Sequence, residues 1–209
     1  MRSTKFLHRY FSFAVDNNSF HKALELLEEI FINDLDNNVI RRSVYKFLDR
    51  FLSEQKYDEV IKICQVALMT HNESRHPWLR YKLANALEQR NGPGDIEASL
   101  NEYKNVLKYQ PDQVMAMSRS AAILKKLGPK HYFEADTLYR RAIDIQKKKD
   151  KLWTQIRSDY AILLENWGEN LSSNLIGKNS DQMVKMGQLC FARAEKMRRE
   201  AAEVSSSKE

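Results

Sequence analysis

The side chains that most often carry catalytic or metal chemistry are few in this chain and scattered along it. Five histidines occur in 209 residues, and His71 and His76 lie close together without a third ligand at a metal-binding spacing. The sequence has no glycine-rich phosphate loop, no Gly-x-Ser-x-Gly turn and no His-Glu-x-x-His zinc motif. We therefore expect no catalytic residue, no metal site and no cofactor, and we expect that the chain is not an enzyme.

Basic side chains form a second group with chemical potential, since lysine and arginine contact phosphate groups. Two clusters cover residues 75–108 and 140–151, and Trp78 or Tyr81 could stack on a base. Acidic side chains are interspersed with the basic ones, which favours an ordinary solvated surface over a nucleic-acid site. RNA binding is therefore the alternative hypothesis. The two clusters consist of Arg75, Arg80, Lys82, Lys104 and Lys108, and of Arg140, Arg141, Lys147, Lys148, Lys149 and Lys151.

Composition points to a helical protein. The 6 glycines and 4 prolines are too few for the many turns of an all-β fold, and 43% of the residues are hydrophobic, enough for a core. The net charge of +6 permits an acidic partner or a nucleic acid without requiring either. No apolar run is long enough to span a membrane. Cys64 and Cys190 fall on apolar helix faces, where we expect buried thiols.

The first fifteen residues admit two interpretations. They hold four basic residues and no acidic one, and basic, acid-free, amphipathic starts resemble mitochondrial presequences. Leu7, Tyr10, Phe11 and Ala14 also follow helical spacing, as in the first helix of a repeat. We expect a cytoplasmic location, with a mitochondrial one as the alternative.

The spacing Ala135-x3-Tyr139-x2-Ala142 recurs along the chain. Looser copies begin at Ala23, Val60 and Ser99, so that successive starts are 37, 39 and 36 residues apart, and a further copy begins at Gly187. A helical period of roughly 34 to 40 residues is typical of a helical solenoid.

Apolar periodicity and turn residues divide the chain into about ten predicted helices. They cover residues 6–15, 20–32, 39–52, 57–69, 78–89, 96–109, 113–127, 133–146, 152–167 and 181–202. We group them into one repeat domain over 1–202, followed by a disordered tail over 203–209. Its units are approximately 4–36, 39–72, 77–111, 113–147 and 152–202, and whether four or five are true repeats stays open.

These patterns resemble the tetratricopeptide repeat family, in which each unit pairs two antiparallel helices. Ala84 stands at the small position of a first helix, and Ser99, Tyr103, Val106 and Pro111 match the second-helix pattern. Ala121 and Ala161 are the corresponding small residues of the next two units, where the helices are expected to approach closely. The first two units depart from the family, since Phe11 and Leu48 stand where it prefers small residues.

The resemblance implies an all-α, right-handed superhelix of helical hairpins whose first helices line a concave, peptide-binding groove. The chain would then be a non-catalytic scaffold for a peptide or helical segment of a protein partner. A clamp for C-terminal carboxylates, which some members have, is not expected because Tyr81 stands where its first lysine should be. The candidate partner-binding residues are Tyr45, Asp49, Tyr81, Asn85, Ser118, Arg119, Ala122, Ser158 and Asp159.

The last predicted helix carries an apolar stripe with two interpretations. The stripe could cap the solenoid, because terminal repeats need a polar outer face, or it could form a dimer interface. Capping, and with it a monomer, is the preferred interpretation. The stripe consists of Met183, Met186, Leu189, Cys190, Ala194 and Met197.

Overall fold

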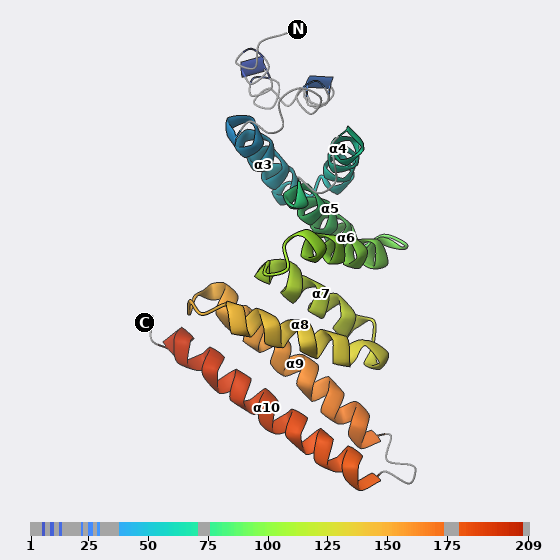
Figure 1. The fold of residues 1–209 in the computed structure, drawn as a ribbon, viewed down its shortest axis with the longest axis vertical. Coiled ribbons are helices and arrows are strands. Elements are labelled where there is room, and N and C mark those ends of the chain that lie inside the picture. Colours follow the sequence, from blue (N-terminus) through green and yellow to red (C-terminus); the bar gives the residue numbers. More distant parts are fainter. Residues whose placement is uncertain are drawn as a thin grey trace. The chain divides into compact units, whose positions relative to one another are not determined.

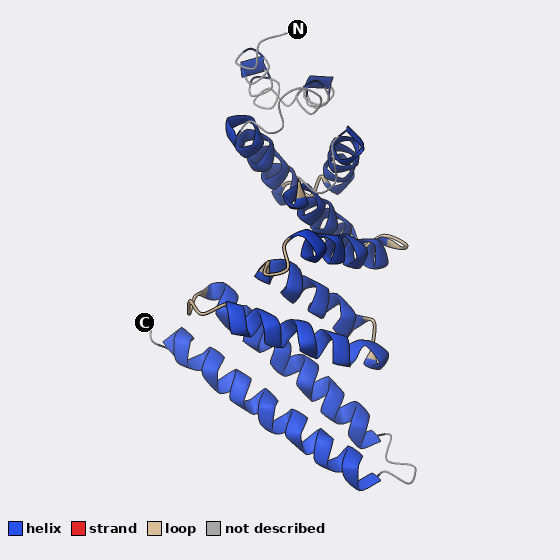
Figure 2. Ribbon diagram, viewed as in Figure 1, coloured by secondary structure: helices blue, strands red, loops and turns tan. Residues whose placement is uncertain are grey.

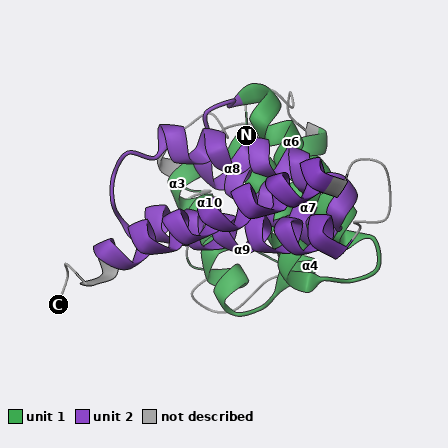
Figure 3. Cartoon of the chain, turned by 90° about the horizontal axis from the view of Figure 1, so that it is seen from below, with its two compact units in different colours: residues 1–109 green, residues 110–209 purple. Residues whose placement is uncertain are grey.

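The computed structural model describes residues 38–70, 76–173 and 180–206. Eight separate residues nearer the N-terminus are also described: Phe6, Arg9, Tyr10, Phe13, Lys22, Glu25, Leu26 and Glu29. These parts of the chain contain helices joined by turns and no β-strand (Figure 2). The chain divides into two compact units, residues 1–109 and 110–209, each described by itself (Figure 3).

The first unit contains four described helices, which pack in chain order: α4 lies against α5, and α5 against α6 (Figure 1). Their bounds are α3 (Asn38–Ser53), α4 (Tyr57–Thr70), α5 (Pro77–Arg90) and α6 (Asp95–Tyr109). Pro77 stands at the start of α5, one residue before the predicted helix 78–89, and a first-turn proline loses no helical hydrogen bond. The predicted helices 6–15 and 20–32 lie outside the described residues, apart from the eight named above.

The second unit contains four α-helices and one short 3₁₀-helix, η1. Helix α7 packs on α8, α8 on α9, and the two longest helices, α9 and α10, lie side by side along most of their length (Figure 1). The bounds are α7 (Val114–Lys126), η1 (Pro129–His131), α8 (Tyr132–Ile145), α9 (Lys151–Ser173) and α10 (Ser180–Ser206).

The recurring small and aromatic positions form the core. The triplets that begin at Val60, Ser99 and Ala135 are buried at all three of their positions. On the facing first helices, Ala84, Ala121 and Ala161 have no exposed surface, as the predicted close helix approach requires.

Each unit also holds a pair of tyrosine rings in tilted contact. In the first unit, the Tyr103 ring centroid lies 5.5 Å from that of Tyr81, and the Tyr103 hydroxyl lies 3.0 Å from a carboxylate oxygen of Glu88. In the second, the Tyr139 centroid on α8 lies 5.5 Å from that of Tyr160 on α9. The second contact joins one predicted repeat to the next, as expected of the aromatic position.

The predicted stop at Gly168 is wrong. Helix α9 continues to Ser173, and Gly168 is buried inside it. A Cβ atom at this position would meet ring atoms of Phe191 on α10 at 2.9–3.1 Å. The glycine therefore makes room for an aromatic ring of the neighbouring helix, and this tertiary contact outweighs the helix-breaking tendency of about 1 kcal/mol.

The predicted tail begins too early. Helix α10 extends to Ser206, and Ala201 and Val204 are buried. Because Ala201 and Val204 are three positions apart, they fall on the same face of the helix, and this face is packed in its last turns. The serines and charged residues around them had suggested a disordered tail. Residues 207–209 lie outside the described residues, and the predicted repeat boundaries stay predictions.

Substitution of Ala121 tests the close helix approach. Because Ala121 is fully buried, Ala121→Leu should overpack the hairpin and lower the free energy of unfolding by about 1–3 kcal/mol. Urea denaturation followed by circular dichroism measures it. The control is Ala122→Leu at the half-buried next position. An equal loss from both variants would contradict this account of α7.

The turn between α5 and α6 supplies a pH-dependent prediction. The Asp95 carboxylate is 4% exposed and accepts hydrogen bonds from Arg90 at 2.7 and 2.8 Å and from the Gly92 N–H at 2.8 Å. The Arg90 guanidinium is the main cause that holds the pKa of Asp95 below its ordinary value of 3.8. This contribution to stability is therefore present above the unfolded pKa and is lost as the pH falls through the folded pKa.

Asp95→Asn should accordingly be less stable than the wild type at pH 7, and the difference should shrink as the pH falls below about 4. Denaturation curves recorded between pH 7 and pH 2.5 measure this convergence. Asp58→Asn serves as the control, because Asp58 also pairs with Arg90 but its side chain is 80% exposed. A stability difference that stays constant with pH would refute the proposed role of Asp95.

Candidate functional site

A cavity of about 590 Å³ lies between α7 and α9 in the second unit. Its lining positions recur at helical spacing, so that one face of each helix turns toward the other. Helix α7 contributes Met115, Ser118, Arg119 and Ala122, and α9 contributes Lys151, Leu152, Gln155 and Asp159. Both are the first helices of predicted repeats, the helices that were expected to line a binding surface.

The cavity combines apolar and charged groups. Met115, Ala122 and Leu152 give it an apolar portion, whereas Arg119 and Lys151 carry positive charge. Asp159 supplies a carboxylate, which accepts a hydrogen bond of 3.0 Å from the Gln155 amide. This mixture suits a short peptide segment, whose side chains offer apolar area and whose backbone offers donors and acceptors.

Two further interactions affect polar groups in or near the cavity. The Ser118 hydroxyl donates to the Met115 carbonyl at 3.1 Å, which leaves the hydroxyl oxygen available as an acceptor. Lys125 lies on the same helix, and burial lowers the pKa of its ammonium group, while the negative charge of Asp159 acts in the opposite direction. The carboxylate of Asp159 therefore influences groups on both helices.

In the first unit, Tyr45 and Asp49 of α3 are linked through one lysine of α5. The Lys82 ammonium lies 3.9 Å from the Tyr45 ring centroid and forms an ion pair with Asp49. The Tyr45 centroid also lies 6.0 Å from that of Trp78. Tyr45 and Asp49 are exposed, as predicted, but each also holds α3 against α5.

The remaining candidates differ in their exposure. Tyr81 is only 8% exposed and packs on Tyr103, so it belongs to the core rather than to an open face. Its large ring fills space between α5 and α6, which the sequence pattern did not distinguish from a surface position. Asn85 is half-buried and accepts a hydrogen bond of 2.6 Å from Gln89. Ser158 is half-buried but does not line the cavity between α7 and α9.

The structure thus brings together four of the predicted residues: Ser118, Arg119, Ala122 and Asp159. Sequence reasoning did not include Met115, Leu152 and Gln155 among the candidates, and it assigned Lys151 to a basic cluster. The three residues of α9 lie four to eight positions before Asp159. Their helical spacing from that residue was the signal that could have identified them.

In the described part of the chain, no group of three or more histidine, cysteine, aspartate or glutamate side chains could hold a metal ion. None of its helices is long and apolar enough to cross a membrane. Cys64 and Cys190 are buried, as predicted, and burial raises the pKa of both thiols, which disfavours the reactive thiolate.

No protein-family model and no curated protein sequence matches this chain. Among solved structures, the chain is similar to a crystal structure of the MamA protein, with a TM-score of 0.60 and 12% identity over 96% of this chain and 94% of that one. A second crystal structure of MamA has a TM-score of 0.57 and 11% identity, over 92% of this chain and 96% of that one. At this identity the likeness concerns the fold alone, and it supports the predicted all-α solenoid of tetratricopeptide-like hairpins.

Proposed function

We propose that this chain is a non-catalytic scaffold that binds a peptide segment of a partner protein between α7 and α9. The observation that carries the proposal is the cavity of about 590 Å³ in which two first helices present apolar, cationic and anionic groups together. This volume falls within the range of about 300–1,000 Å³ that is common for ligand pockets. Arg119 and Lys151, which line it, are both exposed at the surface rather than part of the core.

The charges define the kind of segment that would fit. Arg119 and Lys151 favour an acidic group on the partner, and Asp159 favours a donor such as a backbone N–H or a basic side chain. Met115 and Leu152 offer contact to an apolar side chain between them. A short segment with an apolar residue beside an acidic one therefore matches the cavity best.

The RNA hypothesis loses part of its support. Arg80 is buried and pairs with Glu102 at 2.7 Å, and Lys82 is 3% exposed and pairs with Asp49. These two members of the 75–108 cluster are therefore occupied inside the fold and cannot contact phosphates. Arg75 lies outside the described residues. We therefore favour a protein partner over RNA.

We propose that α10 caps the end of the solenoid. Cys190, Ala194, Ala201 and Val204 are buried on α10, so much of its apolar surface is already used. Met186 and Leu189 stay exposed, at 48% and 58%, and a dimer through them is the alternative to the monomer that we favour.

The cytoplasmic location, with a mitochondrial alternative, stays a prediction, because most of residues 1–15 lie outside the described residues.

The proposal predicts that filling the cavity abolishes partner recovery. Ala122→Leu combined with Arg119→Ala places a larger side chain between α7 and α9 and removes one cation. Quantitative mass spectrometry of pull-downs should show at least about a tenfold loss of the specific partners. Cross-links from Lys151 to the recovered partner would map it to this face.

The matched control combines Ala202→Leu with Arg199→Ala, at exposed positions on α10. It should recover the same partners as the wild type, with thermal melting to verify that all variants fold. Equal recovery by the filled variant would refute the α7–α9 surface. Loss of the partners after nuclease treatment would instead support RNA.

A further inference from the structure

A second cavity, of about 280 Å³, lies between α8, α9 and α10. It is independent of the proposed peptide surface, which is built from α7 and α9. Arg140, Arg193 and Lys196 give it three cations, and Tyr160 lies among them. Asp144 is the one acidic residue that lines it, and Ile143 and Met197 add apolar surface.

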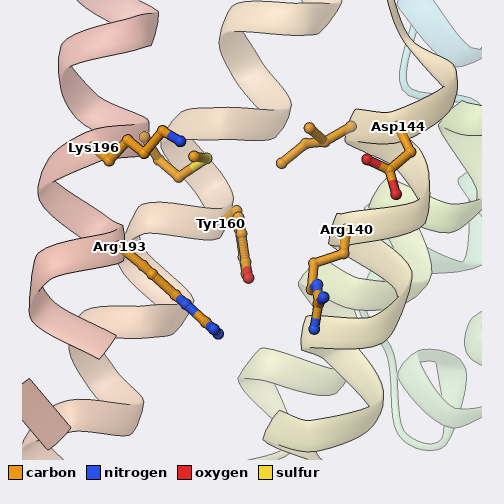
Figure 4. A pocket seen from close by; sticks show the side chains of 7 residues that line it. Arg140, Asp144, Tyr160, Arg193 and Lys196 are labelled. Atoms are coloured by element: carbon orange, nitrogen blue, oxygen red, sulfur yellow. The ribbon is translucent and has the colours of Figure 1, made fainter. Parts of the chain in front are cut away.

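The two arginines approach one space from different helices. Figure 4 shows Arg140 extending from α8 and Arg193 from α10, with their guanidinium groups directed to the region next to the Tyr160 hydroxyl. The Asp144 carboxylate lies farther along α8, apart from the two guanidinium groups (Figure 4). The guanidinium donors of two helices therefore converge where this carboxylate does not reach.

The neighbouring acidic groups leave these donors largely unused. Buried Asp136 accepts a hydrogen bond of 2.6 Å from the Tyr160 hydroxyl, and its other oxygen lies 3.7 Å from Arg140, too far for a hydrogen bond. Lys196 lies 3.9 Å from Glu200. The Arg193 side chain makes no ion pair and no hydrogen bond within the part of the chain that the structure describes.

Water screens part of the repulsion between the two guanidinium groups, since the Arg140 side chain is 63% exposed, and an anion between them would remove more of it. Asp136 supplies part of the compensation for Arg140, but it is buried and already bonded to Tyr160. Two planar guanidinium groups can each bind an oxyanion through paired N–H donors, and Lys196 adds a point charge. The geometry is that of a site whose anion comes from outside.

We propose that this cavity binds the oxyanion of an acidic peptide side chain, either a phosphoryl group or a carboxylate, between Arg140 and Arg193. The apolar walls formed by Ile143 and Met197 would contact the carbon atoms that carry the anionic group. The scaffold would then hold a partner at two places: a peptide between α7 and α9, and an acidic side chain between α8 and α10.

Side-chain NMR tests this site directly. The Nε–Hε resonances of Arg140 and Arg193 are followed while sodium phosphate, O-phosphoserine or sodium acetate is added at constant ionic strength, with sodium chloride as the balancing salt. We expect saturable shifts of both resonances with the oxyanions. Tighter binding of O-phosphoserine than of acetate identifies a phosphoryl ligand, and the reverse order identifies a carboxylate.

Three variants complete the experiment. Arg193→Gln and Arg140→Gln should each weaken oxyanion binding by about tenfold, because each removes a charge-assisted donor pair. Arg199→Gln removes an exposed α10 arginine that pairs with Glu195 outside the cavity, and its affinity should match the wild type. Ala122→Leu should also bind normally, so that failure of the peptide surface is distinguished from failure of this site.

Two outcomes would overturn the proposal. One is a set of shifts that rise linearly with concentration and match those of sodium chloride. The other is unchanged affinity in a folded Arg193→Gln, because the two guanidinium groups would then serve only as counterions for Asp136.

Discussion

The close approach of paired helices through small residues is the constraint on which each unit depends. In the first unit the buried Ser99 hydroxyl of α6 donates to the Ala84 carbonyl of α5 at 2.8 Å, so the two helices lie close at this point. In the second unit a Cβ atom at Gly187 of α10 would lie 3.4 Å from the Gly168 carbonyl oxygen of α9. Backbone approach of this kind lets flanking aromatic side chains interlock around the contact, as Tyr103 and Phe191 do.

This constraint also orients the candidate surfaces. Ala121 is fully buried, whereas Ala122, next to it, and Ser118, three residues before it, lie on the side of α7 that lines the cavity with α9. On α9, Tyr160 and Ala161 are buried, and Asp159 lies one position earlier, about 100° around the helix, on the side of α7. The same small-residue contacts that hold the hairpins together therefore determine which side chains line the cavity.

Sequence reasoning succeeded where a residue's role depends on local periodicity. The buried triplets, the small first-helix positions and most helix ends follow from spacing and turn residues, for example at Pro77 and around Gly92. It failed where the role depends on a distant contact. Gly168 was predicted to end a helix, but it lies inside α9 because the Phe191 ring packs against it. Tyr81 was predicted to be a surface residue, but it is buried against Tyr103. Lys82 was predicted as a possible phosphate contact, but it pairs with Asp49 and packs over the Tyr45 ring.

The buried cations show why a basic composition does not by itself indicate a nucleic-acid partner. Arg80 and Arg157 each stand four positions before the buried alanine of their helix, Ala84 and Ala161, and Met117 holds the equivalent place before Ala121. Each arginine pairs with a glutamate of the second helix of its own hairpin: Arg80 with Glu102 at 2.7 Å and Arg157 with Glu200 at 2.8 Å.

Arg157 also lies 3.5 Å from the Trp153 ring centroid, so its charge is held between a carboxylate and an aromatic face. Buried pairs of this kind give specificity of packing more than stability, because desolvation offsets much of their attraction. Arg80, Met117 and Arg157 thus occupy equivalent buried positions, which accept either an arginine or a methionine. Part of the basic character of the chain therefore belongs to the hairpins themselves. Other cations, such as Lys151 and Arg193, line the two cavities.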